Sequence, residues 1–472
     1  MQFAQRTRAK LVYRLFANRA PFWYNESMEI FIPEAVKRLA ASAGTPIYLV
    51  GGCVRNAIGH LGETDVDLCG PLIATALNLP RGARVKIVNY RLGTALITFM
   101  GGSFEYTPFR LEKYAEGGGH SPVEVKFTTS LEADAQRRDF TVNSIYVNAA
   151  TGEVKDPVGG IADVERKVLR SCAPERTFAS DGLRLLRLAR IAAETGYKID
   201  AATARAAIAS AANLADISGE RKREELEKIL HADQKYGVAD AHYRGLKLVH
   251  KLGLLPYLLE PFDGADKIAQ NPAYHAYDVW EHTLRTVKAA PPSVRLAALF
   301  HDIGKPYCQR VHGNMHGHEK ASAVIARDLL GQRFFRYPKD TAERAAALAE
   351  WHMYDGDGKT KEGKLRLFVA AHFDLIDDLA ALQTADRIGT GKIDAQDVPP
   401  SRLLAVRDRM VQEGAPRTVG DLEISGADLT DMGFEGPAVG KLLDSAFREC
   451  VLCPKLNDRA WLMDYAKKRL PK

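Results

Sequence analysis

The sequence predicts an α/β domain at its N-terminal end, followed by mainly α-helical domains. Up to about residue 170, short apolar segments with strand-like alternation are separated by Gly and Asn turns. Beyond that point Leu, Ile and Ala recur at helical spacing. The length of 472 residues is enough for about three or four domains of ordinary size.

The expected elements follow from these patterns in chain order. Strands are predicted at 47–50, 65–69, 86–88, 95–100 and 104–108, and the glycines at 117–119 predict a flexible loop. Helices are predicted at 181–193, where arginines recur every third residue, and at 220–230, which is charged and amphipathic.

The composition narrows the class of protein. Apolar residues make up 46% and charged residues 26%, as in a globular chain, and the net charge of +6 is compatible with a polyanionic partner. The 6 cysteines form no dense framework, which fits a reducing cytoplasm, and we interpret the lone pair Cys450 and Cys453 as chance. No apolar run is long enough for a membrane span, and the basic residues 1–27 lack the apolar core of a signal peptide.

Two glycines and two carboxylates lie close together in the first domain. Gly51 and Gly52 directly follow a predicted strand, where backbone amides can approach a phosphate. Asp65 and Asp67 are two residues apart in the next predicted strand, so both carboxylates face the same side. Their mutual repulsion is relieved by a divalent cation such as Mg²⁺. Each motif alone is equally typical of a tight turn or a solvated strand end.

Two further polar motifs follow later in the same predicted domain. The chain has Arg-Arg-Asp at 137–139 and Asp-Pro-x-x-Gly at 156–160. Guanidinium forks suit triphosphate oxygens, and a carboxylate accepts from a ribose hydroxyl. Taken together over about residues 45–230, the order and spacing of these blocks resemble the class II tRNA nucleotidyltransferase and bacterial poly(A) polymerase family.

That resemblance implies a polymerase β-like α/β nucleotidyltransferase head followed by mainly α-helical neck, HD and tail domains. It implies that Asp65 and Asp67 hold the catalytic Mg²⁺ ions. Glu105, in a stretch where the family has an acidic residue, is a further catalytic candidate. Asn56 stands where the family usually has Asp, which we expect to cost a local salt bridge rather than activity. The nucleotide-binding residues implied are Gly51, Gly52, Arg55, Arg110, Arg138, Asp139, Asp181, Arg184, Arg187 and Arg190.

Asp181 and Arg184 are expected to select the base. The family uses a short acidic-acidic-x-x-Arg motif at a helix start, and here Ser180 replaces the first acid. Cytosine and adenine both present an amino donor beside a ring-nitrogen acceptor, which Asp and Arg complement, whereas uracil and guanine reverse this pattern. The chain is therefore expected to accept CTP and ATP. An ordinary ion pair at a helix start, capped by Ser180, is the alternative.

A second set of polar residues lies in the middle of the chain. It includes His282, the adjacent pair His301 and Asp302, and Asp386, a mixed His/Asp set of the kind that binds a divalent cation. At these residues the chain resembles the HD superfamily of metal-dependent phosphohydrolases, which implies a divalent metal of unknown identity. The implied ligands are His282, His301, Asp302 and Asp386, with His318 and His352 as ligands for a second ion. A structural HD fold without activity is the alternative.

The predicted domains are an extension at 1–27, the head at 28–170, a neck at 171–235, the HD domain at 236–400 and a tRNA-binding tail at 401–472. In the tail, the glycines at 433, 436 and 440 resemble a helix–hairpin–helix turn that exposes amides to a nucleic-acid backbone.

The expected function is template-independent addition of C, C and A to the 3′ end of tRNA, in the cytoplasm. Two alternatives remain, because they share every sequence block described above. One is a poly(A) polymerase, and the other is a partial enzyme that adds only CC or only A. An HD phosphohydrolase whose head only binds nucleotide is the alternative from another class.

Overall fold

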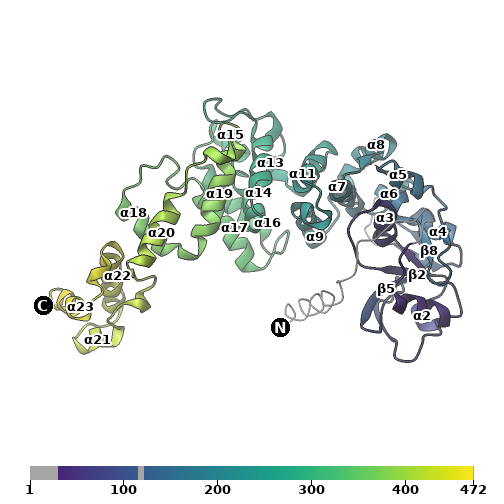
Figure 1. The fold of residues 1–472 in the computed structure, drawn as a ribbon. Helices are drawn as coiled ribbons and strands as arrows, with labels where there is room; N and C mark the ends of the chain where they lie inside the picture. Colours follow the sequence, from purple (N-terminus) through teal and green to yellow (C-terminus); the bar gives the residue numbers. More distant parts are fainter. Residues whose placement is uncertain (1–29, 115–121, 471–472) are drawn as a thin grey trace. The chain divides into compact units, whose positions relative to one another are not determined.

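The structure is a computed structural model that describes residues 30–114 and 122–470. These residues form two compact units, one from residues 30–113 and 123–173 and the other from residues 174–470. The strands of the first unit lie in the purple to blue part of the ribbon in Figure 1, and helices make up the teal to yellow part. An α/β unit followed by a mainly helical one confirms the predicted fold class.

A seven-stranded mixed sheet organises the first unit, with strand order β3-β4-β5-β2-β1-β8-β9. The strands are β1 (Tyr48–Val50), β2 (Asp67–Gly70), β3 (Arg84–Asn89), β4 (Thr94–Phe99), β5 (Gly102–Pro108), β8 (Tyr146–Asn148) and β9 (Val154–Lys155). Strands β2 and β5 run parallel, and the other neighbours run antiparallel.

The two faces of the sheet differ in chemistry. Phe104 and Tyr106 of β5 and Leu68 of β2 are buried on one face. Asp67 and Glu105, which alternate with them, are exposed on the other. The strand predicted at 65–69 begins later than expected. Strand β2 begins at Asp67, so Asp65 lies two residues before the strand rather than within it.

Four helices and a separate hairpin complete the first unit. The helices are α2 (Glu34–Ser42), α3 (Gly52–Gly59), α4 (Leu131–Arg137) and α5 (Gly160–Glu165), with 3-10 turns η1 (Ala74–Ala76) and η2 (Thr141–Asn143). The hairpin pairs β6 (Arg110–Lys113) with β7 (Glu124–Phe127), and a short strand β10 (Val168–Leu169) ends the unit. The predicted loop at 117–119 and the extension at 1–27 lie outside the described residues.

Helices dominate the second unit. Its first half contains α6 (Pro174–Ser180), α7 (Leu183–Thr195), the short strand β11 (Lys198–Ile199), α8 (Ala201–Ala209), α9 (Gly219–Leu230), α10 (Asp233–Tyr236), α11 (Ala241–Lys251) and α12 (Leu255–Leu258). The following bundle contains α13 (Val279–Ala289), α14 (Arg295–Phe300), α15 (Lys305–His312), α16 (His318–Leu330), α17 (Lys339–Trp351), α18 (Glu362–Ala371), α19 (Ile376–Gly389) and α20 (Arg402–Gln412). The last helices are α21 (Gly426–Asp431), α22 (Pro437–Leu452) and α23 (Arg459–Lys467).

The loop between α16 and α17 packs on the first turn of α9. A Cβ added to Gly219 would come within 1.7 Å of the carbonyl oxygen of Phe334, so only glycine allows this approach. Around the contact, Arg336 pairs with Glu220 at 2.9 Å and the Tyr337 hydroxyl donates to Glu227 at 2.6 Å. Helix α9 is therefore fixed by residues more than a hundred positions away in the chain.

The last helices have their own small core, which includes Leu429, Ala446 and Leu462. The predicted hairpin turn joins α21 to α22, with Gly433 and Gly436 at φ of 97° and 51°. These are left-handed conformations that favour glycine. Among the described residues, no helix is long and apolar enough to cross a membrane.

Candidate active site

The register of the sheet brings two carboxylates together. Asp67 is the direct partner of Glu105 across the parallel strands β2 and β5, and Val50 of β1 is the partner of Asp67 on the other side. Neighbouring strands lie about 4.8 Å apart, so both carboxylates project from adjacent positions on the exposed face. Asp65 is also exposed, just before the strand.

Gly51 lies directly beside this carboxylate pair. It follows Val50 at the end of β1 and adopts φ +85° and ψ −139°, a conformation that favours glycine. A Cβ at this position would lie 3.4 Å from Asp67 Oδ2. Helix α3 begins at the next residue, so its free amides and partial positive charge lie close to the carboxylates. This arrangement can place a phosphate group beside a cation held by the carboxylates.

Arg55 is buried and its guanidinium is held by two asparagines. Its Nε and Nη2 donate to Asn56 Oδ1 at 3.1 and 2.8 Å, and its Nη1 donates to Asn143 Oδ1 at 2.8 Å. Asn143 Nδ2 in turn donates to Asp139 at 3.2 Å. The Asn56 amide oxygen thus accepts from Arg55 without a charge. The network joins the motif that contains Arg55 to the block that contains Asp139.

Three arginines share two carboxylates in a cluster that also includes Tyr146 of β8. Asp134 of α4 is fully buried and pairs with Arg137 at 2.6 Å and with Arg138 at 3.0 Å. The Tyr146 hydroxyl donates to Asp134 at 2.9 Å. Glu112 pairs with Arg110 at 2.7 Å and with Arg137 at 3.4 Å. Arg138 and Arg110, both predicted to bind nucleotide, are therefore engaged with carboxylates of the same unit.

Charge pairing sets the ionisation of this cluster. Burial opposes the ionised form of Asp134, but Arg138 and Arg137 outweigh it and lower the pKa of Asp134 to about 2. Burial likewise opposes the charge on Arg138, and Asp134 nevertheless holds the pKa of Arg138 above its ordinary value. The sequence does not single out Asp134, although its position four residues before Arg138 is the spacing of a helical ion pair.

In the second unit, the predicted base-selecting residues lie at the junction of α6 and α7. Asp181 precedes α7 rather than lying within it, and its Oδ1 accepts from the Leu183 amide at 3.0 Å. Its Oδ2 pairs with Arg221 of α9 at 3.1 Å. Arg184 Nη1 donates to the Ser180 hydroxyl at 3.3 Å. Asp181 therefore lies just before the helix that carries Arg184, whereas the sequence predicts one helix from residue 181.

The other two arginines of α7 differ in their surroundings. Arg187 is half-buried, one turn beyond Arg184. Arg190 is buried between Glu225, at 2.6 Å, and Glu194, at 3.0 Å. These pairs favour a role for Arg190 in holding α7 against α9 rather than in binding a nucleotide.

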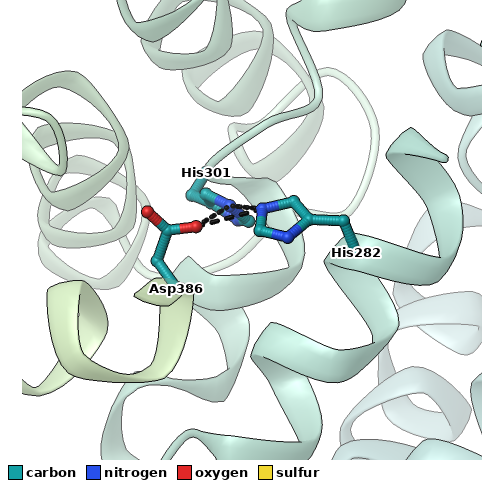
Figure 2. A group of neighbouring side chains, drawn as sticks. All are labelled: His282, His301 and Asp386. Carbon is teal, nitrogen blue, oxygen red and sulfur yellow. Dashed lines mark hydrogen bonds and ion pairs between the residues drawn. The ribbon is translucent and has the colours of Figure 1, made fainter. Parts of the chain in front are cut away.

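The predicted HD residues converge in the second unit from different helices. His282 lies on α13, His301 and Asp302 follow α14, and Asp386 lies on α19. His282 Nε2 is 3.0 Å from Asp386 Oδ1 and 3.2 Å from Asp302 Oδ2, and His301 Nε2 is 3.3 Å from His282 Nε2. Figure 2 shows His282, His301 and Asp386 pointing toward one another.

A second group of possible ligands shares His301 with the first. His352 and Asp302 have ligand atoms within 4.8 Å of His301, and His318 Nε2 lies 3.2 Å from Asp302 Oδ1. His301, His318 and His352 each donate Nδ1 to a backbone carbonyl at 2.6–2.8 Å. These bonds direct Nε2 into the centre, as in metal-binding histidines.

The centre fits a divalent cation on two further observations. The Asp302 carboxylate is buried, and the Nε2 atoms of His282, His301 and His318 each lie 3.2 Å from one of its oxygens. Burial disfavours a charged imidazole, but Asp302 and Asp386 outweigh it and raise the pKa of His301 to about 10. An anionic field that retains a proton so strongly also favours a metal ion.

Four further basic residues lie near these ligands in the sequence, at 275, 305, 312 and 316, and the structure distinguishes between them. Lys305 Nζ lies 2.6 Å from Asp302 Oδ2, and the ring of His275 lies 4.8 Å from that of His282. His312 and His316 are exposed. Lys305 and His275 therefore belong to the centre, and the other two do not.

Comparisons with known proteins match the domains that carry the two candidate sites. The family model of the poly A polymerase head domain matches residues 47–170, that of the HD domain matches residues 273–406, and that of the probable RNA- and SrmB-binding site of polymerase A matches residues 196–264. The chain is thus a nucleotidyltransferase with an HD domain.

Relatives extend the likeness over most of the chain. A CC-adding tRNA nucleotidyltransferase of Thermus thermophilus is 32% identical over 419 residues, 84% of this chain and 87% of that protein. A multifunctional CCA protein of Pseudomonas aeruginosa is 27% identical over 85% of this chain and 96% of that protein. The match to a CCA-adding enzyme of Lactiplantibacillus plantarum, 37% identical, spans only 46% of that enzyme. The chain belongs to the tRNA nucleotidyltransferase and poly(A) polymerase family.

The fold agrees with a solved structure of the same kind. The Bacillus stearothermophilus CCA-adding enzyme in complex with CTP matches with a TM-score of 0.64 and 23% identity, over 92% of this chain and 96% of that one. At this identity the likeness concerns the fold.

Proposed function

We propose that this protein adds C, C and A to the 3′ end of tRNA from CTP and ATP, without a template and with release of pyrophosphate. The observation that supports this most is the register pair of Asp67 and Glu105 beside the Gly51 turn. The names of the relatives, which include CCA-adding, CC-adding and A-adding enzymes, agree with tRNA as the substrate. We place the reaction in the cytoplasm.

We assign the head metal to Asp65, Asp67 and Glu105. Three exposed carboxylates at adjacent positions repel one another unless a cation lies between them. Oxygen ligands of this kind suit Mg²⁺, which when bound stabilises negative charge on phosphate oxygens and favours ionisation of a hydroxyl.

In the proposed reaction, the RNA 3′-oxygen forms a bond to the α-phosphorus of the nucleotide. The bond from that phosphorus to the bridging oxygen breaks, and pyrophosphate leaves. The amides at Gly51 and Gly52 would hold the leaving phosphates, with the charges of Arg55 and Arg138 beneath them. Asp139 would accept from the ribose.

The neck and the tail have proposed roles in binding. Asp181 and Arg184 would complement the amino donor and ring-nitrogen acceptor that cytosine and adenine share. Arg221, which contacts Asp181, would keep its carboxylate in place. The amides of the Gly433 to Gly436 turn would contact the RNA backbone.

Nucleotide incorporation into a tRNA transcript that ends at its discriminator base tests the function. CTP alone should give addition of CC, and ATP alone should give no addition. Both nucleotides together should give addition of CCA. Addition of CC only, of A only to a transcript that ends in CC, or of a long A tail would assign a sister activity. No incorporation from any mixture would refute a nucleotidyltransferase function.

Arg184→Ala should weaken the choice of base. Without the guanidinium, the ring nitrogen loses its donor, and the ratio of kcat/KM for CTP over UTP should fall by roughly tenfold or more. Competition between CTP and UTP on one transcript measures this ratio. Arg205→Ala, at an exposed arginine of α8, is the matched control. An unchanged ratio in the Arg184 variant would refute the proposed recognition.

A second activity, hydrolysis of a phosphate ester at the HD centre, is favoured by the three imidazole nitrogens that converge on the buried Asp302 carboxylate. A cyclic 2′,3′-phosphate or a 2′-phosphate at an RNA end is the substrate class that would make a 3′ end available for extension.

Asp302→Asn should lower this hydrolysis by about a hundredfold or more, because the group that Asp302 forms with His301 and His352 loses its carboxylate charge. Assays of cyclic phosphate hydrolysis with Mn²⁺, Ni²⁺ and Mg²⁺ and a measurement of bound metal test it. His312→Ala, at an exposed histidine, is the control, and nucleotide addition should be unchanged in both variants. Absence of hydrolysis by the unaltered protein with every metal would exclude the second activity.

A further inference from the structure

The exposed face of the sheet extends from the carboxylates to basic residues on an edge strand. Glu105 of β5 is the register partner of Leu96 of β4, and Leu96 is the partner of Lys86 of β3. Together with Asp67, these residues form one row across four strands. Lys86 is exposed and lies two strands, about 10 Å, from Glu105.

A second row lies two residues along the same strands and therefore on the same face. Ser103 of β5 is the partner of Thr98 of β4, and Thr98 is the partner of Arg84 of β3. Arg84 and Lys86 are both exposed, and neither has an ion pair or side-chain hydrogen bond to any described residue. Two unneutralised cations thus follow one another along the edge strand.

The chemistry of nucleotide addition suggests which substrate lies over the sheet between the carboxylates and β3. In an in-line displacement, the attacking oxygen and the leaving oxygen lie on opposite sides of phosphorus. The Gly51 turn, where the leaving phosphates are proposed to bind, lies on the β1 side of Asp67. With the leaving phosphates on that side, the RNA 3′ end would approach from the opposite side, over β5, β4 and β3.

We propose that Arg84 and Lys86 bind phosphates of the RNA strand close to its 3′ end and guide that end to Asp67 and Glu105. The inference rests on the proposed nucleotidyltransferase function. Charge complementarity supports an RNA backbone as the occupant, because a polyanion gains affinity from each unpaired cation by releasing a counterion. The small polar side chains of Ser103 and Thr98 leave room for a strand over the sheet.

The double variant Arg84→Gln, Lys86→Gln of the full-length protein tests this assignment. The KM for a tRNA transcript should rise several-fold, while the KM for CTP and kcat at saturating tRNA stay close to those of the unaltered protein. The slope of log affinity for tRNA against log salt concentration should become shallower by about 1.4, or roughly 0.7 for each single-strand phosphate contact.

Lys37→Gln is the matched control, because Lys37 is an exposed lysine of the same unit on α2, outside the sheet. It should change none of these quantities. An increase in the KM for CTP instead of that for tRNA would mean that the two cations bind the triphosphate, and would overturn the proposal. So would a tRNA KM and salt slope equal to those of the control. If the unaltered protein adds no nucleotide, the proposed function fails instead.

Discussion

Asp67→Ala should reduce nucleotide addition by at least about a thousandfold. Asp67 is the central carboxylate of the site, since it pairs with Glu105 on one side and lies beside Gly51 on the other. Loss of a ligand at a phosphoryl-transfer metal removes several kcal/mol of transition-state stabilisation. Single-turnover incorporation of CMP into a tRNA transcript at saturating Mg²⁺ measures the loss.

The control for this variant is Glu153→Gln, at an exposed carboxylate of the same unit, in the turn that precedes β9. It should leave addition unchanged. Hydrolysis at the HD centre should survive in the Asp67 variant, which separates the two activities. A variant without Asp67 that still adds CMP at a tenth of the normal rate would contradict the assignment of the catalytic carboxylates.

Asp134→Asn should destabilise the first unit by about 3–5 kcal/mol. The substitution keeps the volume of the side chain but leaves Arg137 and Arg138 without their buried counter-charge. Because the whole chain does not unfold in one step, hydrogen exchange of β8 amides is the suitable measurement. Glu132→Gln, an exposed position on the same helix, should change the protection by less than about 0.5 kcal/mol. Protection of β8 equal to that of the unaltered protein would contradict this role.

The same carboxylate predicts how the stability of the first unit depends on pH. The pKa of Asp134 in the folded protein, about 2, lies below its ordinary value of 3.8. A lowered pKa contributes stability that is complete above about pH 4 and is lost as the pH falls toward 2. The contribution is roughly 2 kcal/mol, and the Asn variant should lack this part of the acid dependence.

The residues that the sequence predicts best are those set by short motifs. Gly51 directly follows the apolar strand β1 and Asp67 begins β2, so their place at strand ends can be inferred from local spacing. The HD ligands come from separated helices, and only the resemblance to a family joins them before the structure does. The convergence of His282, His301 and Asp386 agrees with that resemblance.

What the sequence predicts less well depends on register and on long-range pairing. The partnership of Asp67 with Glu105 depends on the alignment of two strands separated by a long connection. Asp134 and Glu112 have no motif of their own, since their role arises only when α4 and the β6–β7 hairpin bring three arginines together. The helix predicted from residue 181 begins two residues later, at Leu183, and a Cβ on Gly182 would lie 2.2 Å from the Asn213 carbonyl oxygen, a close approach that local spacing does not show.

The contact between Gly219 and Phe334 limits where the chain can be truncated without disturbing α9. A fragment that stops after the predicted neck would contain α9 without the loop that covers its first turn, and Glu220 and Glu227 would lose Arg336 and Tyr337. Since α9 also supplies Arg221 to Asp181, such a truncation would loosen the α6–α7 junction without altering any residue within it. A fragment intended to keep this junction intact should therefore extend beyond residue 337.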